Sequence, residues 1–197
     1  MSKRVLIVTG DGAEVLEVYY PLFRVREEGY TAVIAAPRTK TLYTVCHDFV
    51  DGWDTYTEKP AHQLVADIAF ADVAPGEYDA LIIPGGRAPE FIRNDPDLPR
   101  ILQHFLEAGK PIGAICHGVQ VFLALPNRSY FKDKTISAYN ACKLDVESLG
   151  ARYADGTLQV DGKLVSGHAW PDLPGFMREF LNLLGRASNK EVASSAS

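Results

Sequence analysis

A short apolar segment that ends at a cysteine between small residues constrains the fold of this 197-residue chain more than any other feature. The segment Ile112–Ile115 has the pattern of a buried strand, and an apolar helix is expected over Val119–Leu125. A strand that turns sharply into a helix needs small residues two before and two after the turning residue, because the two elements pass close together. Ala114 and Gly118 occupy those positions around Cys116. The pattern predicts a nucleophile elbow in which the helix N-terminus favours a Cys116 thiolate.

Strand and helix patterns alternate along the rest of the chain. Apolar, β-branched runs predict buried strands, and longer amphipathic runs predict helices between them. The predicted strands are 5–9, 31–36, 81–83 and 112–115, and the predicted helices are 13–28, 98–108 and 173–184. This alternation predicts an α/β fold, a three-layer sandwich with a mostly parallel, flavodoxin-like central sheet.

The sequence predicts one domain over residues 1–186. Short alternating runs broken by Asp51-Gly52 predict a hairpin inserted off the main sheet at about 41–58. A second small β-like patch, 158–166, leads into the last helix. The tail 187–197 is small and polar, and we expect it to be disordered.

Composition excludes several classes of partner. The net charge is −5 and no basic cluster is present, so nothing favours binding to nucleic acid or to an anionic membrane. No apolar stretch approaches the length of a membrane span, and the first residues lack the pattern of a secretory signal. The three cysteines are widely spaced and form neither a disulfide framework nor a zinc pattern, so Cys46 and Cys142 are interpreted as packing residues. We expect a cytoplasmic protein.

Three segments together resemble the DJ-1/PfpI superfamily, which has the class I glutamine amidotransferase-like fold. They are Glu17–Pro21, Asp79–Glu90 and Gly109–Gly118, and the resemblance runs from Arg4 to about Leu184. The segment 47–62 is similar to the branch that holds PfpI-type intracellular peptidases and glyoxalases that need no glutathione. The resemblance implies a cysteine nucleophile, no cofactor and a homo-oligomer, either a dimer or a hexamer.

Glu17 lies in a largely apolar stretch of the first predicted helix. Burial of a carboxylate raises its pKa and favours the protonated form. The resemblance implies that this glutamate contacts the sulfur of Cys116, where a protonated carboxyl can donate to a thiolate and then act as general acid and base. The alternatives are that Glu17 is exposed or that Glu14 takes its place.

His117 directly follows the proposed nucleophile, but adjacent residues on a turn need not point together. In PfpI-like peptidases the matching histidine is the base, and its acidic partner matches Glu90, contributed across a subunit contact. Alternatively, His117 contributes mainly its backbone N–H to an oxyanion site. The sequence leaves both roles open.

Gly85 and Gly86 follow Pro84 at the end of a predicted strand, at the same sheet edge as Cys116. Glycine permits close backbone approach, and consecutive N–H groups can form an oxyanion hole. The segment Gly10–Gly12 lacks the third glycine of a dinucleotide-binding motif, so we reject that cofactor.

Three further residues are candidates for the wall of the substrate pocket. His168 and Trp170 precede the last helix, where the resemblance implies that the pocket is lined, and His47 belongs to the predicted hairpin. His168 is interpreted either as a group that polarises a small carbonyl or as a surface loop residue. The histidines, including His62, have no ligand spacing, so no metal site is predicted.

The preferred hypothesis is glutathione-independent glyoxalase chemistry on a small carbonyl substrate, a 2-oxoaldehyde such as methylglyoxal. In this hypothesis Cys116 forms a hemithioacetal and Glu17 moves a proton between the two former carbonyl carbons. The alternatives are a PfpI-type cysteine peptidase that uses Cys116, His117 and Glu90, and a redox or carbonyl-stress sensor or chaperone based on Cys116.

Overall fold

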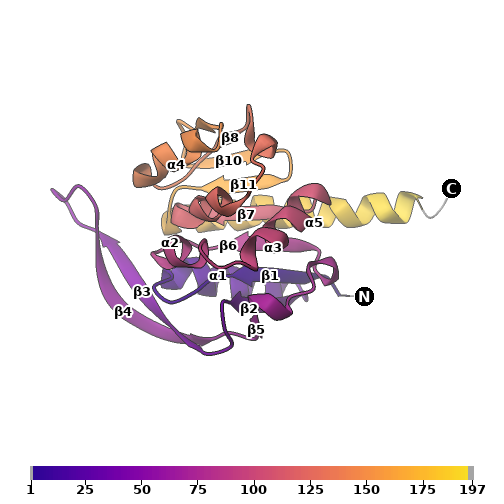
Figure 1. Cartoon of the computed structure of the whole chain (residues 1–197), viewed down its shortest axis with the longest axis horizontal. Helices are drawn as coiled ribbons and strands as arrows, with labels where there is room; N and C mark the ends of the chain where they lie inside the picture. Colours follow the sequence, from indigo (N-terminus) through magenta and orange to yellow (C-terminus); the bar gives the residue numbers. More distant parts are fainter. Residues whose placement is uncertain (1, 195–197) are drawn as a thin grey trace.

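The computed structural model describes residues 2–194, with side chains to residue 185, and is built on one central sheet (Figure 1). The seven strands lie in the order β10-β11-β7-β6-β1-β2-β5. β10 pairs with β11 in antiparallel fashion, and the other neighbours are parallel. The strands are β1 (Arg4–Val8), β2 (Thr31–Ala36), β5 (Ile68–Ala69), β6 (Ala80–Ile83), β7 (Ile112–Ile115), β10 (Leu158–Asp161) and β11 (Leu164–Gly167). The predicted α/β class with a mostly parallel sheet is confirmed.

Helices cover both faces of the sheet, because alternate residues of each buried strand point to opposite sides. On β1, Val5 and Ile7 pack in one cluster with α1 (Val15–Glu27) and α5 (Leu173–Ser194). Leu6 packs in the other cluster, with α3 and the segment after β7. The remaining α-helices are α2 (Ala88–Ile92), α3 (Leu98–Glu107) and α4 (Lys143–Ser148).

Shorter elements connect these layers. A small separate sheet is formed by the parallel pair β8 (Thr135–Ile136) and β9 (Arg152–Tyr153). The 3₁₀ helices are η1 (Phe70–Asp72), η2 (Pro75–Glu77), η3 (Cys116–Ala124), η4 (Ser129–Phe131), η5 (Asn140–Cys142) and η6 (Trp170–Asp172). The helix after β7, expected to begin at Val119, is therefore a 3₁₀ helix that begins at Cys116 itself.

The inserted hairpin consists of β3 (Thr41–Phe49) and β4 (Tyr56–Val65). It reaches beyond the expected end near residue 58, and its tip projects from one side of the molecule (Figure 1). Its base is attached to the loop after β1, where the N–H of Val45 donates to the carbonyl of Ala13. The hairpin is therefore held beside the loop at the carboxyl end of β1, a strand in the interior of the sheet.

The end of the chain differs in part from the expectation. α5 is helical to Ser194, so it includes much of the segment 187–197 for which disorder is predicted from composition. Residues 195–197 lie outside the described residues. Within the described range, no helix combines the length and apolar character needed to cross a membrane.

Candidate active site

Cys116 is the first residue after β7 and adopts a left-handed backbone conformation, with φ of 59°. This conformation is unfavourable for a non-glycine residue and is typical of strained functional turns. Two residues on, a Cβ at Gly118 would lie under 3.0 Å from the carbonyl oxygen of Ile83 on β6. The turn therefore has the close strand-to-helix approach that the small residues around Cys116 predict.

Glu17 is fully buried on α1, beside the turn. Its Oε2 accepts a hydrogen bond of 2.8 Å from the N–H of Gly85, while its Oε1 has no partner among the described residues. Burial raises the pKa of Glu17 to about 8, with a smaller contribution from the charge of Glu14, and the Gly85 hydrogen bond opposes this shift. The carboxyl is therefore mostly protonated at neutral pH.

Glu14 fixes the backbone of Glu17 at the start of α1. Glu14 precedes the first turn of α1, and its Oε2 accepts a hydrogen bond of 2.9 Å from the backbone N–H of Glu17. A side-chain acceptor at this position satisfies an N–H that has no partner within the helix. Glu14 therefore caps the first turn of α1. It too is buried, and burial raises its pKa.

Gly85 is the point at which the three candidate catalytic residues converge. A Cβ on Gly85 would lie under 3.0 Å from three atoms, namely Cys116 Cβ, Glu17 Oε2 and His117 N. Gly86 has a φ of 73°, and a Cβ there would lie within the same limit of the backbone of the loop before α1. Only glycine fits at these two positions without displacing the site.

The Cys116 thiol is 4% exposed, and its burial raises its pKa well above the ordinary value. The charge of an ionised Glu17 raises the pKa further, while the N–H groups of Gly86 and His117 lower it by hydrogen bonding to the sulfur. The expected thiolate at a helix N-terminus is therefore not the resting form, because burial outweighs the backbone donors. The same two donors are placed to stabilise negative charge that develops beside the sulfur.

The structure brings His117 to Cys116, whereas within the described residues Glu90 makes no hydrogen bond or ion pair with either. His117 Nδ1 lies 3.2 Å from Cys116 Sγ, and burial together with the nearby His47 lowers the pKa of His117 to about 4. His117 is therefore neutral at physiological pH and can accept a thiol proton. Glu90 is exposed on α2, and within the described residues of one chain no hydrogen bond or ion pair joins its carboxyl to His117. Its role as the acid of a Cys–His pair stays a prediction.

Aromatic rings form a wall beside the Cys–His pair. His117 stacks on Tyr139 with ring centroids 5.2 Å apart, and Tyr56 meets the edge of His117 at 5.9 Å. His168 packs on Tyr139 at 5.3 Å, and Phe49 lies between Tyr139 and Trp170. The predicted wall residues His168 and Trp170 thus lie on one aromatic cluster with the catalytic turn.

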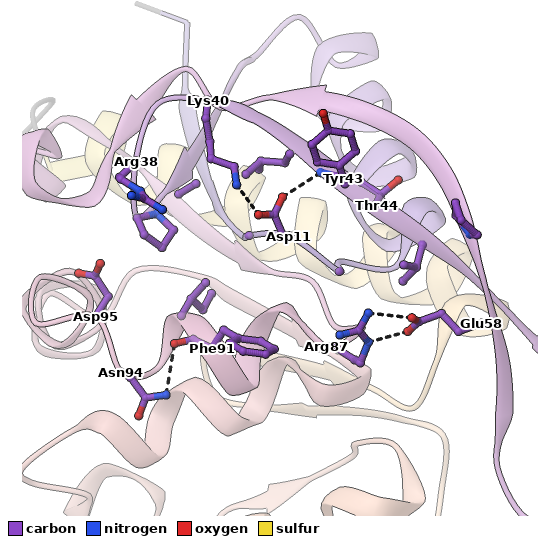
Figure 2. Close-up of a pocket in the computed structure, with 18 of the residues that line it drawn as sticks. Asp11, Arg38, Lys40, Tyr43, Thr44, Glu58, Arg87, Phe91, Asn94 and Asp95 are labelled. Carbon is purple, nitrogen blue, oxygen red and sulfur yellow. Dashed lines mark hydrogen bonds and ion pairs between the residues drawn. The ribbon is translucent and has the colours of Figure 1, made fainter.

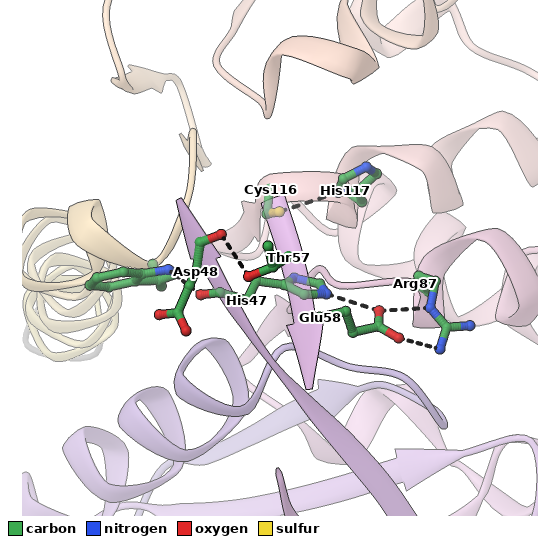
Figure 3. A network of polar contacts seen from close by, with 8 residues as sticks. His47, Asp48, Thr57, Glu58, Arg87, Cys116 and His117 are labelled. Atoms are coloured by element: carbon green, nitrogen blue, oxygen red, sulfur yellow. Dashed lines mark hydrogen bonds and ion pairs between the residues drawn. The ribbon is translucent and has the colours of Figure 1, made fainter. Parts of the chain in front are cut away.

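His47 belongs to the same wall from the hairpin side. It is 3% exposed and stacks on Tyr56 with ring centroids 4.0 Å apart, and its carbonyl accepts a hydrogen bond of 3.1 Å from Trp170 Nε1. Its Nε2 donates to Glu58, which is itself paired with Arg87 (Figure 3). His47 therefore packs in the same aromatic cluster as Tyr56 and Trp170, and its role in lining a substrate pocket stays a prediction.

A match to the DJ-1/PfpI family covers residues 3–183. The chain belongs to the DJ-1/PfpI family. A deglycase of Thermococcus kodakarensis is 35% identical over 92% of this chain and 99% of its own length. Protein DJ-1 homolog D of Arabidopsis thaliana is 36% identical over 93% of this chain, which spans only 48% of that longer protein.

Solved structures of DJ-1/PfpI proteins share the fold. A two-domain protein of Anabaena variabilis with DJ-1/ThiJ/PfpI-like and ferritin-like domains superposes with a TM-score of 0.79 and 28% identity. The similarity covers 93% of this chain and 48% of the other. The fold of the family is thus reproduced over nearly the whole chain.

Within this DJ-1/PfpI site, sequence analysis missed Tyr56, Tyr139, Glu58 and Arg87. None of them lies in a motif around Cys116. Tyr139 follows β8, and its N–H donates to the carbonyl of Cys116 at 3.3 Å, whereas Tyr56 and Glu58 arrive on β4. The pairing of β3 with β4 places Glu58 opposite His47. A correct prediction of the hairpin register would therefore have identified Glu58.

A separate cavity of about 890 Å³ lies on the other side of the hairpin (Figure 2). It is bounded by the loops after β1 and β2, by β3 and β4, and by α2 with the turn that follows, and Cys116 is not part of its lining. Glu58 and Arg87 line it, so they stand between this cavity and the aromatic wall. Among the described residues, no group of three His, Cys, Asp or Glu side chains is arranged to hold a metal ion.

Proposed function

We propose that this protein converts a 2-oxoaldehyde such as methylglyoxal to the corresponding 2-hydroxy acid without glutathione. The observation that carries the proposal is Glu17, a fully buried carboxyl with a pKa of about 8 that converges with Cys116 on Gly85. A group that titrates near neutral pH both gives and takes protons readily. The deglycase name of a relative that matches over its full length supports carbonyl chemistry at such a site.

The reaction begins when the Glu17–Cys116 pair, which holds two protons at rest, releases one of them to solvent water. The proton that remains is held by the Glu17 carboxyl while the Cys116 thiolate attacks the aldehyde carbon. A carbon–sulfur bond forms, and the electron pair of the C=O bond moves to oxygen. The backbone N–H groups of Gly86 and His117 stabilise that oxygen, and Glu17 then protonates it to give a hemithioacetal.

The ionised Glu17 next removes the hydrogen on the former aldehyde carbon, giving an enediolate. It returns that proton to the neighbouring carbon, while the hydroxyl proton on the first carbon passes to the second oxygen. The first carbon is thereby oxidised and the second reduced, so the step needs no external oxidant. The product is a thioester of a 2-hydroxy acid, which water cleaves to release the acid and the Cys116 thiol.

Lactate formation from methylglyoxal without glutathione tests this proposal. Cys116→Ser and Glu17→Gln should each abolish turnover while the far-UV and near-UV circular dichroism spectra stay unchanged, and a loss of at least about 100-fold is expected for general acid–base catalysis. Glu28→Gln, an exposed position at the end of the same helix, is the matched control and should retain full activity. Normal turnover by Glu17→Gln would refute the proposed role.

A cysteine peptidase is the second candidate, favoured by the 3.2 Å contact between Cys116 and His117. In this alternative the neutral His117 takes the thiol proton, and Glu90 of a second copy would have to complete the triad in a homo-oligomer. Such an activity should disappear when the oligomer dissociates and when Glu90 is replaced by Gln. Glyoxalase turnover that survives Glu90→Gln would separate the two candidates.

A sensor role is supported less, because a buried thiol with a raised pKa is oxidised slowly. Mass spectrometry after mild peroxide treatment distinguishes it. Rapid, stable conversion of Cys116 alone to a sulfinate, in a protein that forms no lactate, would favour the sensor over both enzymes.

A further inference from the structure

The hairpin is attached through Glu58 to Arg87, which directly follows Gly85 and Gly86. Glu58 Oε1 accepts a hydrogen bond from Arg87 Nη2 and Oε2 accepts one from Arg87 Nε, both at 2.8 Å. Oε2 also accepts one from His47 Nε2 at 3.0 Å. One carboxylate on β4 thus joins a residue of β3 to a residue outside the hairpin (Figure 3).

Arg87 connects this carboxylate to the backbone beside Cys116. Arg87 directly follows Gly86, whose N–H hydrogen-bonds to the Cys116 sulfur, and the N–H of Arg87 donates to the carbonyl of Gly12 at 2.8 Å. The Arg87 backbone is therefore fixed at the end of the segment Gly85-Gly86, called here the oxyanion loop after its proposed role, and the Arg87 guanidinium reaches out to the hairpin. A bidentate pair between planar groups defines direction as well as distance.

On its other side, Glu58 holds the ring that supports the pocket wall. His47 stacks face to face on Tyr56, and Tyr56 in turn meets the edge of His117. His47 is almost fully buried, and its ring nitrogen Nε2 has Glu58 as its hydrogen-bond partner. The order of contacts is therefore Arg87, Glu58, His47, Tyr56 and His117, from the oxyanion loop back to the residue beside the nucleophile.

We propose that Glu58 is a positioning residue that keeps the hairpin closed over Cys116 and fixes the His47–Tyr56 wall against His117. It touches none of the reacting atoms and acts through these two partners. The expected effect of Glu58 on turnover rests on the proposed function. Its expected effect on the accessibility of Cys116 rests only on the contacts of the hairpin.

A competing interpretation is that the pair is an ordinary surface ion pair. Side-chain exposures of 46% for Arg87 and 30% for Glu58 would suit that interpretation, and isolated surface pairs contribute little. The buried His47 argues against it, because loss of Glu58 leaves a buried donor without its acceptor. The neighbouring pair Lys59–Asp48, at 3.6 Å on the same two strands, lacks such a link and serves as a matched control.

Alkylation of Cys116 by iodoacetamide, followed by peptide mass spectrometry at fixed pH, measures closure without reference to any reaction. Glu58→Ala should raise the rate about 10-fold or more, since Cys116 is only 4% exposed in the closed form. Glu58→Gln, which retains hydrogen-bonding atoms, should lie between Glu58→Ala and the parent protein. Lys59→Ala should leave the rate unchanged. Cys142, fully buried elsewhere, should stay unreactive throughout and reports any general unfolding.

Turnover of methylglyoxal provides the second measurement. We expect Glu58→Ala to lower kcat/KM about 10-fold with kcat affected less, because the wall orients substrate rather than reacting with it. Arg87→Ala should act similarly, and the double variant should be no worse than either single one.

The outcomes separate the two proposals. Faster Cys116 alkylation in a protein that forms no lactate keeps Glu58 as the closing residue and removes the glyoxalase. Unchanged alkylation and turnover in Glu58→Ala, or Cys142 becoming reactive together with Cys116, would overturn the role given to Glu58.

Discussion

The catalytic turn and the hairpin that covers it are built in different ways. At the turn, Cys116, Gly85 and Glu17 sit where β7, β6 and α1 meet, and the backbone leaves no room for a Cβ on the glycine. The part of the hairpin beyond its backbone hydrogen bond from Val45 to Ala13 is attached by side chains, through the Glu58 pair and through aromatic stacking, and Phe49 and Trp53 near its tip are 47% and 63% exposed. Close backbone packing fixes the first region, whereas the second is held by contacts that single substitutions can remove.

The two regions are proposed to have different roles, one in bond and proton transfer and the other in substrate selection. In the proposed reaction, the groups that carry proton and bond transfer lie in the buried turn, where burial raises the pKa values of Glu17 and Cys116. In the same proposal, the groups that decide which carbonyl compound can approach lie mostly on the wall. Substitutions in the turn should therefore alter stability and kcat, while those in the wall should alter access and KM.

The largest expected effect on stability comes from the buried carboxyl in the turn. Between pH 4.5 and about 8 the folded protein keeps a proton on Glu17 that the unfolded chain has released. The folded state then binds more protons, so the free energy of unfolding falls as the pH rises through this range. From about pH 5 to about pH 8 the loss is on the order of 3 kcal/mol. Glu17→Gln has no proton to lose, so its stability should fall less over the same range.

Urea unfolding of both proteins at the two pH values measures the difference between their slopes. Glu28→Gln, exposed on the same helix, should behave as the parent protein. Some slope will remain in Glu17→Gln, because burial also raises the pKa of Glu14. Parallel pH dependence in the parent protein and Glu17→Gln would mean that the Glu17 carboxyl is not held protonated by burial.

The second effect tests the close approach of strand and helix. A Cβ at Gly118 would meet the carbonyl oxygen of Ile83 on β6, which cannot move without displacing the sheet. Gly118→Ala should therefore lower the free energy of unfolding by about 2–3 kcal/mol, measured by urea unfolding. Gly76→Ala is the control, since nothing lies within 4 Å of a Cβ at that position. Equal stability of the two variants would show that the turn is looser than described.

The same division explains what the sequence could predict. The strand–cysteine–small-residue pattern around Cys116 and the Pro84-Gly85-Gly86 segment are local, and both indicated strand ends at one sheet edge. Parallel strands place such ends together, so the fold and the neighbourhood of Cys116 could be inferred. The raised pKa of Cys116 could not, because it depends on how completely the turn is buried.

Wall residues were harder to predict because no single segment contains them. Tyr56, Tyr139 and Glu58 reach the site only after the hairpin folds across it and the segment after β8 returns to it. The hairpin was predicted too short, since residues 59–65 carry polar side chains and a proline that hide its second strand. Glu90 is a candidate from the resemblance alone, and within the described residues of one chain it is exposed and has no hydrogen bond or ion pair to His117.

The smallest expected effect lies at the outer end of the wall. Phe49 is half exposed and stacks against Trp170 and Tyr139, with ring centroids 6.1 Å and 6.3 Å away. Such contacts contribute about 1 kcal/mol, so Phe49→Ala should lower kcat/KM for methylglyoxal roughly 3- to 5-fold, mainly through KM. Tyr43→Ala, exposed at the other end of the same strand, should have no effect. A fall in kcat with KM unchanged would mean that Phe49 affects the chemical step. The division of roles between the turn and the wall would then be wrong for this residue.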